Sequence, residues 1–410
     1  MTVATDIPAA ESTDELVMDT TERGAETGEQ APITSGMSRP ATGAPSRLRV
    51  LMLTAYPAIG GPLPKLAPLV AEGLRRCGCD MEIEGWSAHT AGRERLAVKV
   101  VGRTIDLARV HHRIRAWKPE VIYVATAHNW PGLLRDLPLV LTVRHGRPPL
   151  VLHLHGSECD RLGRPGQLLF SALSRLLVRR ASSVMLLSTE ELRAWRRTCP
   201  KTDFNVVVNP FIAPQVDHQL SLDHGDSRSP TLLTIARLIA EKGVFDLLDA
   251  LAILHRRIPC RLIMAGTGPA REDLVRRVAA LDLGDAVELC GYVSGRRLEE
   301  VYRRADLFVL PTYFAEGFPL SIMEAMGHGL PVVTTRIRGS ADQLAPGEHV
   351  LFVPARDPQA LAAAIEALLA DDALRAHMSR ANVARVAEFA PERVIPRYAE
   401  ILRSVVARQG

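Results

Sequence analysis

Short apolar runs alternate with longer amphipathic stretches along most of the chain, and this alternation is the strongest constraint on its fold. The runs have the length and composition of buried strands, and the stretches between them have helical spacing. Such alternation predicts an α/β fold in which helices cover both faces of parallel sheets. We predict a first series of strands at residues 48–53, 121–125, 150–154, 184–187 and 205–208, and a second at 231–235, 261–265, 286–289, 307–310 and 331–334.

The length of the chain and its polar stretches indicate how it divides into domains. A chain of 410 residues is too long for one ordinary core and indicates two domains of about 150 to 200 residues. The two strand series meet near Asn209, and residues 1–45 lack any hydrophobic period. We predict a disordered acidic tail at 1–45, α/β domains at 46–208 and 209–390, and a C-terminal helix at 391–410 that packs back across the join.

Composition and cysteine spacing exclude several classes of protein. The apolar fraction of 47% is that of a soluble globular protein. No apolar run reaches the roughly 18 residues that a membrane span requires, and no basic segment followed by an apolar core marks a secretory signal. The six cysteines form neither a Cys-x-x-Cys pair nor a cluster with zinc spacing. We therefore expect reduced thiols in a cytosolic protein.

Positive charge is concentrated in one block of the chain. The net charge of +4 divides into −6 for residues 1–45, +12 for residues 46–205 and −2 for residues 206–410. An anionic membrane surface, a phosphate-bearing acceptor or a nucleic acid would each suit the basic block, and arginine-rich solvated helices explain it equally well. No nucleic-acid module accompanies the block, so we expect no nucleic-acid partner.

Two carboxylates, Glu316 and Glu324, lie eight residues apart around a predicted helix start. The strand-like run 307–310 ends at Pro311, and the helix is predicted to begin near Pro319, because proline fits a first helical turn. Free N–H groups and the helix dipole bind phosphate at such a start. Two carboxylates beside them can accept hydrogen bonds from several hydroxyls. The segment therefore indicates a sugar-nucleotide site.

Two basic residues and a histidine also lie at predicted strand ends. Arg237 and Lys242 follow the first strand of the second series, where an arginine fork and a compact lysine charge can hold a diphosphate. An ordinary solvated loop is the alternative. His155 ends a first-series strand and precedes a glycine, so it could donate a hydrogen bond to substrate. It could equally be a structural histidine, which is how we interpret His153.

In this order and at this spacing, the residues resemble the GT-B retaining glycosyltransferases of family 4. The most specific matches are the Glu-x7-Glu segment from Glu316 to Glu324 and the Arg237-x4-Lys242 segment. The resemblance runs from about Leu48 to the C-terminus. It implies a GT-B fold, in which two Rossmann-like domains with parallel sheets face a central cleft and the second domain holds the donor.

The resemblance also implies a role for each site residue. Arg237 and Lys242 would hold the diphosphate and stabilise the leaving nucleoside diphosphate. Glu324 would accept the ribose hydroxyls, Glu316 would orient the donor sugar, and His155 would reach that sugar from the opposite domain. Further donor contacts and cleft positions implied by the resemblance are the N–H groups of Gly317, Phe318 and Leu320, the turn at Pro319, a base contact by the backbone from Gly291 to Val293, and the cleft loop Gly60-Gly61.

The implied activity is hexosyl transfer from a UDP- or GDP-sugar to a hydroxyl acceptor, lipid-linked or phosphorylated, in cell-envelope glycan, polysaccharide or glycoconjugate biosynthesis. The expected route is front-face displacement with no cofactor or metal, in the cytoplasm, with peripheral contact to anionic membrane at the inner face of the plasma membrane. A GT-B epimerase or phosphorylase and a non-catalytic nucleotide-sugar-binding protein are the alternatives. The chain departs from the family pattern at Arg338-Gly339-Ser-Ala-Asp342, where Gly-Gly-x-Pro-Glu is frequent.

Overall fold

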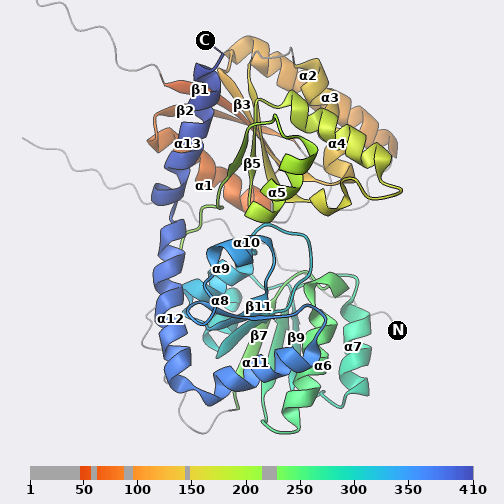
Figure 1. Ribbon diagram of the computed structural model, residues 1–410, viewed down its shortest axis with the longest axis vertical. Helices are drawn as coiled ribbons and strands as arrows, with labels where there is room; N and C mark the ends of the chain where they lie inside the picture. The colour runs from red at the N-terminus through yellow and green to blue at the C-terminus, as the bar shows by residue number, and fades with distance from the viewer. Residues whose placement is uncertain (1–46, 57–61, 87–95, 144–147, 215–228, 410) are drawn as a thin grey trace, which may run out of the picture. The chain divides into compact units, whose positions relative to one another are not determined.

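The computed structural model describes residues 47–56, 62–86, 96–143, 148–214 and 229–409 (Figure 1). All of these belong to one compact unit, Arg47–Gly410. The predicted tail at 1–45 and the predicted cleft loop Gly60-Gly61 lie outside the described residues. The predicted fold class is confirmed, because the described residues form two parallel sheets of six strands each, covered by helices.

The first sheet has the strand order β2-β1-β3-β4-β5-β6. Its strands are β1 (Leu48–Thr54), β2 (Cys79–Gly85), β3 (Val121–His128), β4 (Leu150–Ser157), β5 (Ser183–Leu186) and β6 (Phe204–Val206). The helices between them are α1 (Pro62–Arg76), α2 (Leu96–Trp117), α3 (Trp130–Thr142), η1 (Cys159–Arg161), α4 (Leu168–Arg180) and α5 (Thr189–Thr198).

The second sheet has the order β12-β11-β10-β7-β8-β9. Its strands are β7 (Thr231–Ile235), β8 (Arg261–Ala265), β9 (Val287–Gly291), β10 (Leu307–Leu310), β11 (Val332–Thr335) and β12 (Val350–Val353). The helices are η3 (Ala240–Lys242), α6 (Val244–His255), α7 (Arg271–Ala280), α8 (Arg296–Arg303), α9 (Leu320–Gly327), α10 (Arg338–Gln343), α11 (Pro358–Ala370), α12 (Asp372–Val386), η4 (Ala387–Phe389) and α13 (Pro391–Ala407).

A hydrophobic core packs on each face of each sheet. Successive side chains of a strand point to opposite sides, so one strand contributes to both cores. In β1, Val50 and Met52 join the core on one face, while Leu51 and Leu53 join the core on the other. The predicted second-series strands at 231–235, 261–265 and 307–310 coincide with β7, β8 and β10. The sequence prediction missed β2 and β12, which lie at the edges of their sheets.

The last helix, α13, completes the core of the first sheet. Ile395, Tyr398 and Leu402 are buried with residues of β1, β3 and α1. The Tyr398 hydroxyl also donates to the carbonyl of Val208, at 2.8 Å. In Figure 1 the preceding helix, α12, lies beside the second sheet, whereas α13 lies beside the first. The chain therefore passes twice between the two sheets, once after β6 and once after η4.

Candidate functional site

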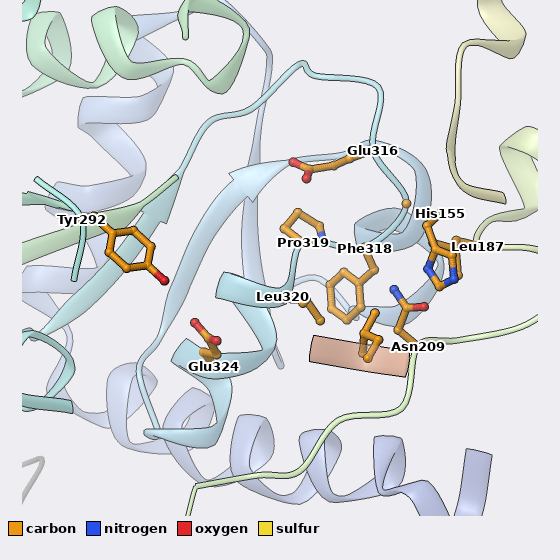
Figure 2. A pocket seen from close by; sticks show the side chains of 11 residues that line it. His155, Leu187, Asn209, Tyr292, Glu316, Phe318, Pro319, Leu320 and Glu324 are labelled. Carbon is orange, nitrogen blue, oxygen red and sulfur yellow. The ribbon is translucent and has the colours of Figure 1, made fainter. Parts of the chain in front are cut away.

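A pocket lies where the carboxyl ends of strands from both sheets meet, the usual ligand position in open α/β sheets. Its volume is about 290 Å³. Figure 2 shows His155 and Asn209 on one side, Glu324 and Tyr292 on the other, and the turn at Phe318 to Leu320 between them. The lining residues are Leu66, His155, Leu187, Asn209, Tyr292, Glu316, Gly317, Phe318, Pro319, Leu320 and Glu324.

The turn between β10 and α9 supplies backbone donors to this pocket. Pro319 is the N-cap residue of α9 and has an extended backbone, with φ −60° and ψ 125°. Within the described residues, the N–H groups of Gly317, Phe318 and Leu320 donate to no protein acceptor. Unsatisfied N–H groups at a helix start form a ready site for a phosphate. The predicted helix start and its donors are therefore placed in the pocket wall.

Lys242 and Glu316, 74 residues apart in the chain, form an ion pair. Lys242 is only 8% exposed, and its ammonium also lies 5.2 Å from the centre of the Phe314 ring. The segment before it is fixed to the strand-end loop, because the Tyr313 N–H donates to the Glu241 carbonyl at 2.8 Å. The pair places a positive charge behind a carboxylate of the pocket wall.

Arg237, the other predicted diphosphate ligand, lies apart from that pair. Its side chain is exposed after β7, and it forms no ion pair with any described residue. It is not among the residues that line the pocket. The structure thus brings Lys242 and Glu316 together. It leaves Arg237, just after the end of β7, without an ion-pair partner among the described residues.

Glu324 is held by a tyrosine that the sequence prediction did not include. The Tyr302 hydroxyl donates to the Glu324 carboxylate at 2.9 Å. The Tyr302 ring is fully buried and stacks on the His328 ring, with 4.4 Å between centres and 12° between planes. The His328 imidazole in turn lies 2.8 Å from the Glu324 carbonyl. The carboxylate is therefore fixed in orientation before any ligand binds.

The predicted base contact is the backbone from Gly291 to Val293, and the Val293 side chain itself is buried in the hydrophobic cluster that also contains Phe318 and Ile322. The neighbouring Tyr292 is 66% exposed and lines the pocket instead. A planar base could stack on such a ring. In this segment, therefore, the side chain that a ligand in the pocket can contact is that of Tyr292.

The first sheet contributes a neutral histidine. Burial lowers the pKa of His155 to about 3, although the Asn209 side chain beside it raises the pKa in part. His153 lies behind it, with 3.9 Å between ring centres, and its Nδ1 is 2.6 Å from the Tyr123 hydroxyl. The Nδ1 of His155 is buried without a partner among the described residues. His155 is therefore an uncharged hydrogen-bonding group at neutral pH.

Three lining residues that the sequence prediction omitted lie within three residues of the end of a strand. Leu187, Asn209 and Tyr292 come after β5, β6 and β9. Their places at strand ends were a usable signal, because ligands bind outside those ends. Leu66 comes from α1, and no motif around it marks it as a pocket residue.

Several classes of site are not found in the described part of the chain. No group of three or more His, Cys, Asp or Glu side chains there is placed to hold a metal ion. No helix within the described ranges has the length and apolar character to cross a bilayer. The six cysteines are all free thiols.

Comparison with known proteins now connects this geometry to a family. Residues 224–385 match the family model described as Glycosyl transferases group 1. This part of the chain is thus similar to a glycosyl transferases group 1 domain. It contains Arg237, Lys242, Glu316 and Glu324, which are the charged residues of the predicted site.

Relatives and solved structures extend the likeness. An exopolysaccharide phosphotransferase of Streptomyces coelicolor is 30% identical over 251 residues, covering 60% of this chain and 26% of the relative. A glycogen synthase of Mycobacterium tuberculosis is 28% identical over 281 residues, covering 65% of this chain and 64% of the relative. The chain thus spans less than two thirds of each relative.

A solved structure aligns with nearly all of the described residues. The Anabaena protein HepE, in complex with UDP and glucose, aligns with a TM-score of 0.67 and 19% identity, over 87% of this chain and 100% of that one. At that identity the likeness shows the fold alone. The fold is the GT-B arrangement of two parallel-sheet α/β domains that the resemblance implied.

Proposed function

We propose that this protein is a glycosyltransferase that moves a hexose from a nucleoside-diphosphate sugar to a hydroxyl acceptor in polysaccharide biosynthesis. The observation that carries the proposal is the pocket wall formed by the Lys242–Glu316 pair and the free N–H groups that precede α9. A diphosphate suits the lysine and the N–H groups, while sugar hydroxyls suit the carboxylates. The glycosyl transferases group 1 domain and the likeness to a structure with bound UDP and glucose support the same class.

The pocket groups divide between the two ends of the donor. Lys242 and Arg237 would carry the charge of the departing diphosphate, and Glu324, fixed by Tyr302, would accept the ribose hydroxyls. Glu316 and His155 would contact the sugar from opposite walls. Stabilising the charge on the leaving group and holding the reactants together lower the barrier without a metal. UDP and GDP are the proposed donor nucleotides.

The reaction proposed is a front-face displacement that retains configuration. The bond between the anomeric carbon and the β-phosphate oxygen breaks, and its electron pair leaves with the nucleoside diphosphate. The acceptor oxygen bonds to the same face of that carbon, and its proton passes to the departing phosphate oxygen. Both pocket carboxylates are already engaged, Glu316 by Lys242 and Glu324 by Tyr302, which disfavours either as a covalent nucleophile.

The outer face of the first domain supports a lipid-linked acceptor reached at the inner face of the plasma membrane. Leu134 of α3 and Leu168 and Leu169 of α4 are exposed, and these two helices pack together. Two arginines precede α4, of which Arg161 is half-buried and Arg164 is exposed. Apolar side chains beside arginines suit an anionic bilayer surface.

The nucleotide arm of the test is calorimetric titration of UDP, GDP and ADP, with Lys242→Met and Glu324→Gln beside the matched exposed control Glu272→Gln. We expect one nucleotide to bind the wild type and the control with the same affinity. Its affinity for both pocket variants should be at least tenfold lower. If none of the three nucleotides binds the wild type, the donor proposal is overturned. NMR of the product anomeric proton then decides between retention and inversion.

The membrane arm uses vesicles of phosphatidylglycerol and phosphatidylcholine. We expect the wild type to sediment with the anionic vesicles and Leu168→Glu to lose most of that association. Val275→Glu, on α7 of the second domain, is the control, since Val275 is also an exposed apolar residue. Equal sedimentation of Leu168→Glu and the control would contradict the assignment of this face.

A further inference from the structure

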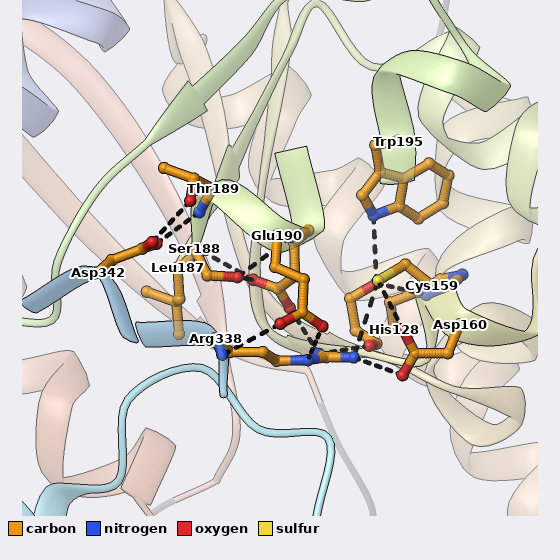
Figure 3. A network of polar contacts seen from close by, with 12 residues as sticks. His128, Cys159, Asp160, Leu187, Ser188, Thr189, Glu190, Trp195, Arg338 and Asp342 are labelled. Carbon is orange, nitrogen blue, oxygen red and sulfur yellow. Dashed lines mark hydrogen bonds and ion pairs between the residues drawn. The ribbon is translucent and has the colours of Figure 1, made fainter. Parts of the chain in front are cut away.

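Arg338 reaches from the second domain into the first. It begins α10, yet only 2% of it is exposed, and its guanidinium lies among first-domain residues (Figure 3). The guanidinium donates to the Ser157 carbonyl at 2.7 Å and to the Glu191 carboxylate at 3.1 Å, and it pairs with Asp160 at 2.9 Å. This fork uses the several fixed donors that distinguish arginine from lysine.

The backbone conformation of Arg338 is one that glycine adopts more readily. Its φ is 43°, in the left-handed region where a Cβ is disfavoured. Glycine is frequent at this position in the family that the chain resembles. An arginine held in such a conformation must be stabilised by its surroundings. The guanidinium contacts with the first domain stabilise it, as does the hydrogen bond that the Arg338 N–H donates to the Glu190 carboxylate at 3.2 Å.

The principal partner, Glu191, depends on Arg338 in return. The Glu191 side chain is fully buried and also accepts hydrogen bonds from Ser188 and from the Leu187 N–H, at 3.1 and 3.2 Å. Burial raises the pKa of Glu191, and Arg338 opposes that rise. A buried carboxylate without its cation is strongly destabilising, so the two charges stabilise each other's burial.

Arg338 connects to the pocket on both of its sides. In the first domain, Ser157 ends β4 two residues after His155, and Leu187 lines the pocket. In the second, the N–H of Gly339 donates to the Gly317 carbonyl at 2.9 Å. The Arg338 guanidinium is thus linked to Leu187 through Glu191, and the Arg338 backbone is linked to Gly317 through Gly339. Leu187 and Gly317 line the pocket from the two different domains.

A second contact at the far end of α10 holds the same two elements together. Asp342 accepts hydrogen bonds from the N–H and the hydroxyl of Thr189, both at 2.6 Å (Figure 3). Thr189 is the first residue of α5, where a carboxylate interacts favourably with the helix dipole. The position of α10 against α5 is therefore fixed at two points.

We propose that Arg338 is a positioning residue that sets the distance between the strand carrying His155 and the turn from Glu316 to Leu320. Its effect on catalysis rests on the proposed function, because those two walls are taken to hold opposite sides of the donor sugar. Lys242 and Glu324 lie wholly in the second domain, so nucleotide binding does not require this contact. Loss of Arg338 should therefore slow turnover much more than it weakens donor binding.

The decisive variant is Arg338→Gly, which removes the guanidinium and also relieves the backbone strain. Arg338→Lys keeps the charge but loses the fork. Arg336→Gly is the matched control, because Arg336 is exposed and lies over the Phe352 ring of its own domain, 5.3 Å from its centre. With UDP-glucose hydrolysis as the readout, we expect kcat to fall about 100-fold in Arg338→Gly, with KM within threefold. Arg338→Lys should recover part of kcat, and the control should match wild type.

Hydrogen exchange measured by mass spectrometry tests the contact without any turnover. In Arg338→Gly, peptides covering residues 189–198 and 316–327 should both exchange faster, while thermal unfolding shows that the variant remains folded. Unchanged exchange in either segment, or kcat within twofold of wild type, would overturn the proposal. If the wild type binds a nucleotide other than UDP, the glucose conjugate of that nucleotide replaces UDP-glucose as the substrate. If it binds none of UDP, GDP and ADP, the proposed function fails, and the exchange result alone then upholds or overturns the contact.

Discussion

The two domains present the same kind of strand edge to the pocket but bring different chemistry to it. The first contributes the neutral side chains of His155 and Leu187, with Asn209 at the join, and the second contributes Glu316 and Glu324 with Lys242 behind them. A charge acts more strongly where its surroundings are neutral and poorly hydrated. The comparison indicates that the second domain handles the charges of the ligand, and the first excludes water and orients the sugar.

The same contrast extends through the buried histidines. His128, His153 and His155 all lie in the first domain, and burial lowers the pKa of each. In the second domain, burial also lowers the pKa of His349, which is 9% exposed, but the nearby Glu348 carboxylate raises that pKa in part. The neutrality of the first domain is therefore a property that acid can test.

The largest predicted effect is selective loss of first-domain stability in acid. The pKa of His128 and of His155 is about 3 in the folded protein and near 6.5 when unfolded. Below pH 6.5 the unfolded chain binds more protons, so folding free energy is lost as pH falls toward 3. The loss is up to about 4 to 5 kcal/mol for each histidine. Urea unfolding between pH 7 and pH 4, followed by tryptophan fluorescence, measures it in the domain that holds all four tryptophans, Trp86, Trp117, Trp130 and Trp195.

His128→Gln sharpens that measurement. Removing the imidazole should reduce the slope of stability against pH by about 1.4 kcal/mol per pH unit near pH 5. His255→Gln, at an exposed position at the end of α6, should leave the slope unchanged. Equal slopes in the wild type and in His128→Gln would contradict the assignment of acid sensitivity to this histidine.

The next largest effect concerns the charge that the second domain supplies. Lys242→Met should reduce sugar transfer by about 100-fold to 1000-fold, because a preorganised charge at the leaving group contributes about 3 to 4 kcal/mol. His155→Asn, on the neutral wall, should cost only about tenfold, as expected for one uncharged hydrogen bond. Steady-state kinetics of both variants, with Lys201→Met as an exposed control, measures the difference. A larger loss in His155→Asn would reverse the division of roles.

The two domains also differed in how far the sequence could predict them. The second-series strands β7, β8 and β10 were predicted to the residue because each is a short, mainly apolar run with polar residues, glycine or proline close to its ends. The edge strand β2 was missed because Asp80, Glu82 and Glu84 interrupt it, as suits a strand with one neighbour. β12, the edge strand of the second sheet, was missed as well.

For the site, the sequence identified the groups that chemistry marks and missed those that only the fold brings together. Glu316, Glu324 and His155 were predicted from their residue types and positions, and the structure places all three in one pocket. Tyr302 could not be predicted, because it meets Glu324 from a different helix, 22 residues away in the chain. Arg338 was visible only as a departure from the family pattern. Its role depends on partners 147 to 181 positions earlier.

A smaller difference between the domains is predicted at two glycines. Gly243 has φ +71°, and a Cβ there would lie 2.2 Å from the Pro311 carbonyl oxygen, beside Lys242. Gly163, in the first domain, has φ +78° with no described atom within 4 Å of a Cβ. Gly243→Ala should cost about 3 kcal/mol and Gly163→Ala about 1 kcal/mol, since only the first adds a steric clash to the backbone strain. Urea unfolding of both variants measures the two losses of free energy. Equal losses would mean that the backbone around Lys242 shifts at little cost to relieve the clash.

The smallest predicted effect tests whether the second domain fixes its own carboxylate. Tyr302→Phe removes one hydrogen bond to Glu324 but keeps the ring stacked on His328, so UDP affinity should fall about fivefold, or about 1 kcal/mol. Tyr313→Phe is the control, because it removes the same hydroxyl from a ring that packs against the Arg356 guanidinium, 4.4 Å from the ring centre. Titration with UDP and 2′-deoxy-UDP completes a double-mutant cycle. If Tyr302 orients Glu324 toward the ribose, deleting the 2′-hydroxyl should cost less in Tyr302→Phe than in wild type. Equal costs would mean that Glu324 contacts the ribose without this support, or does not contact its 2′-hydroxyl at all.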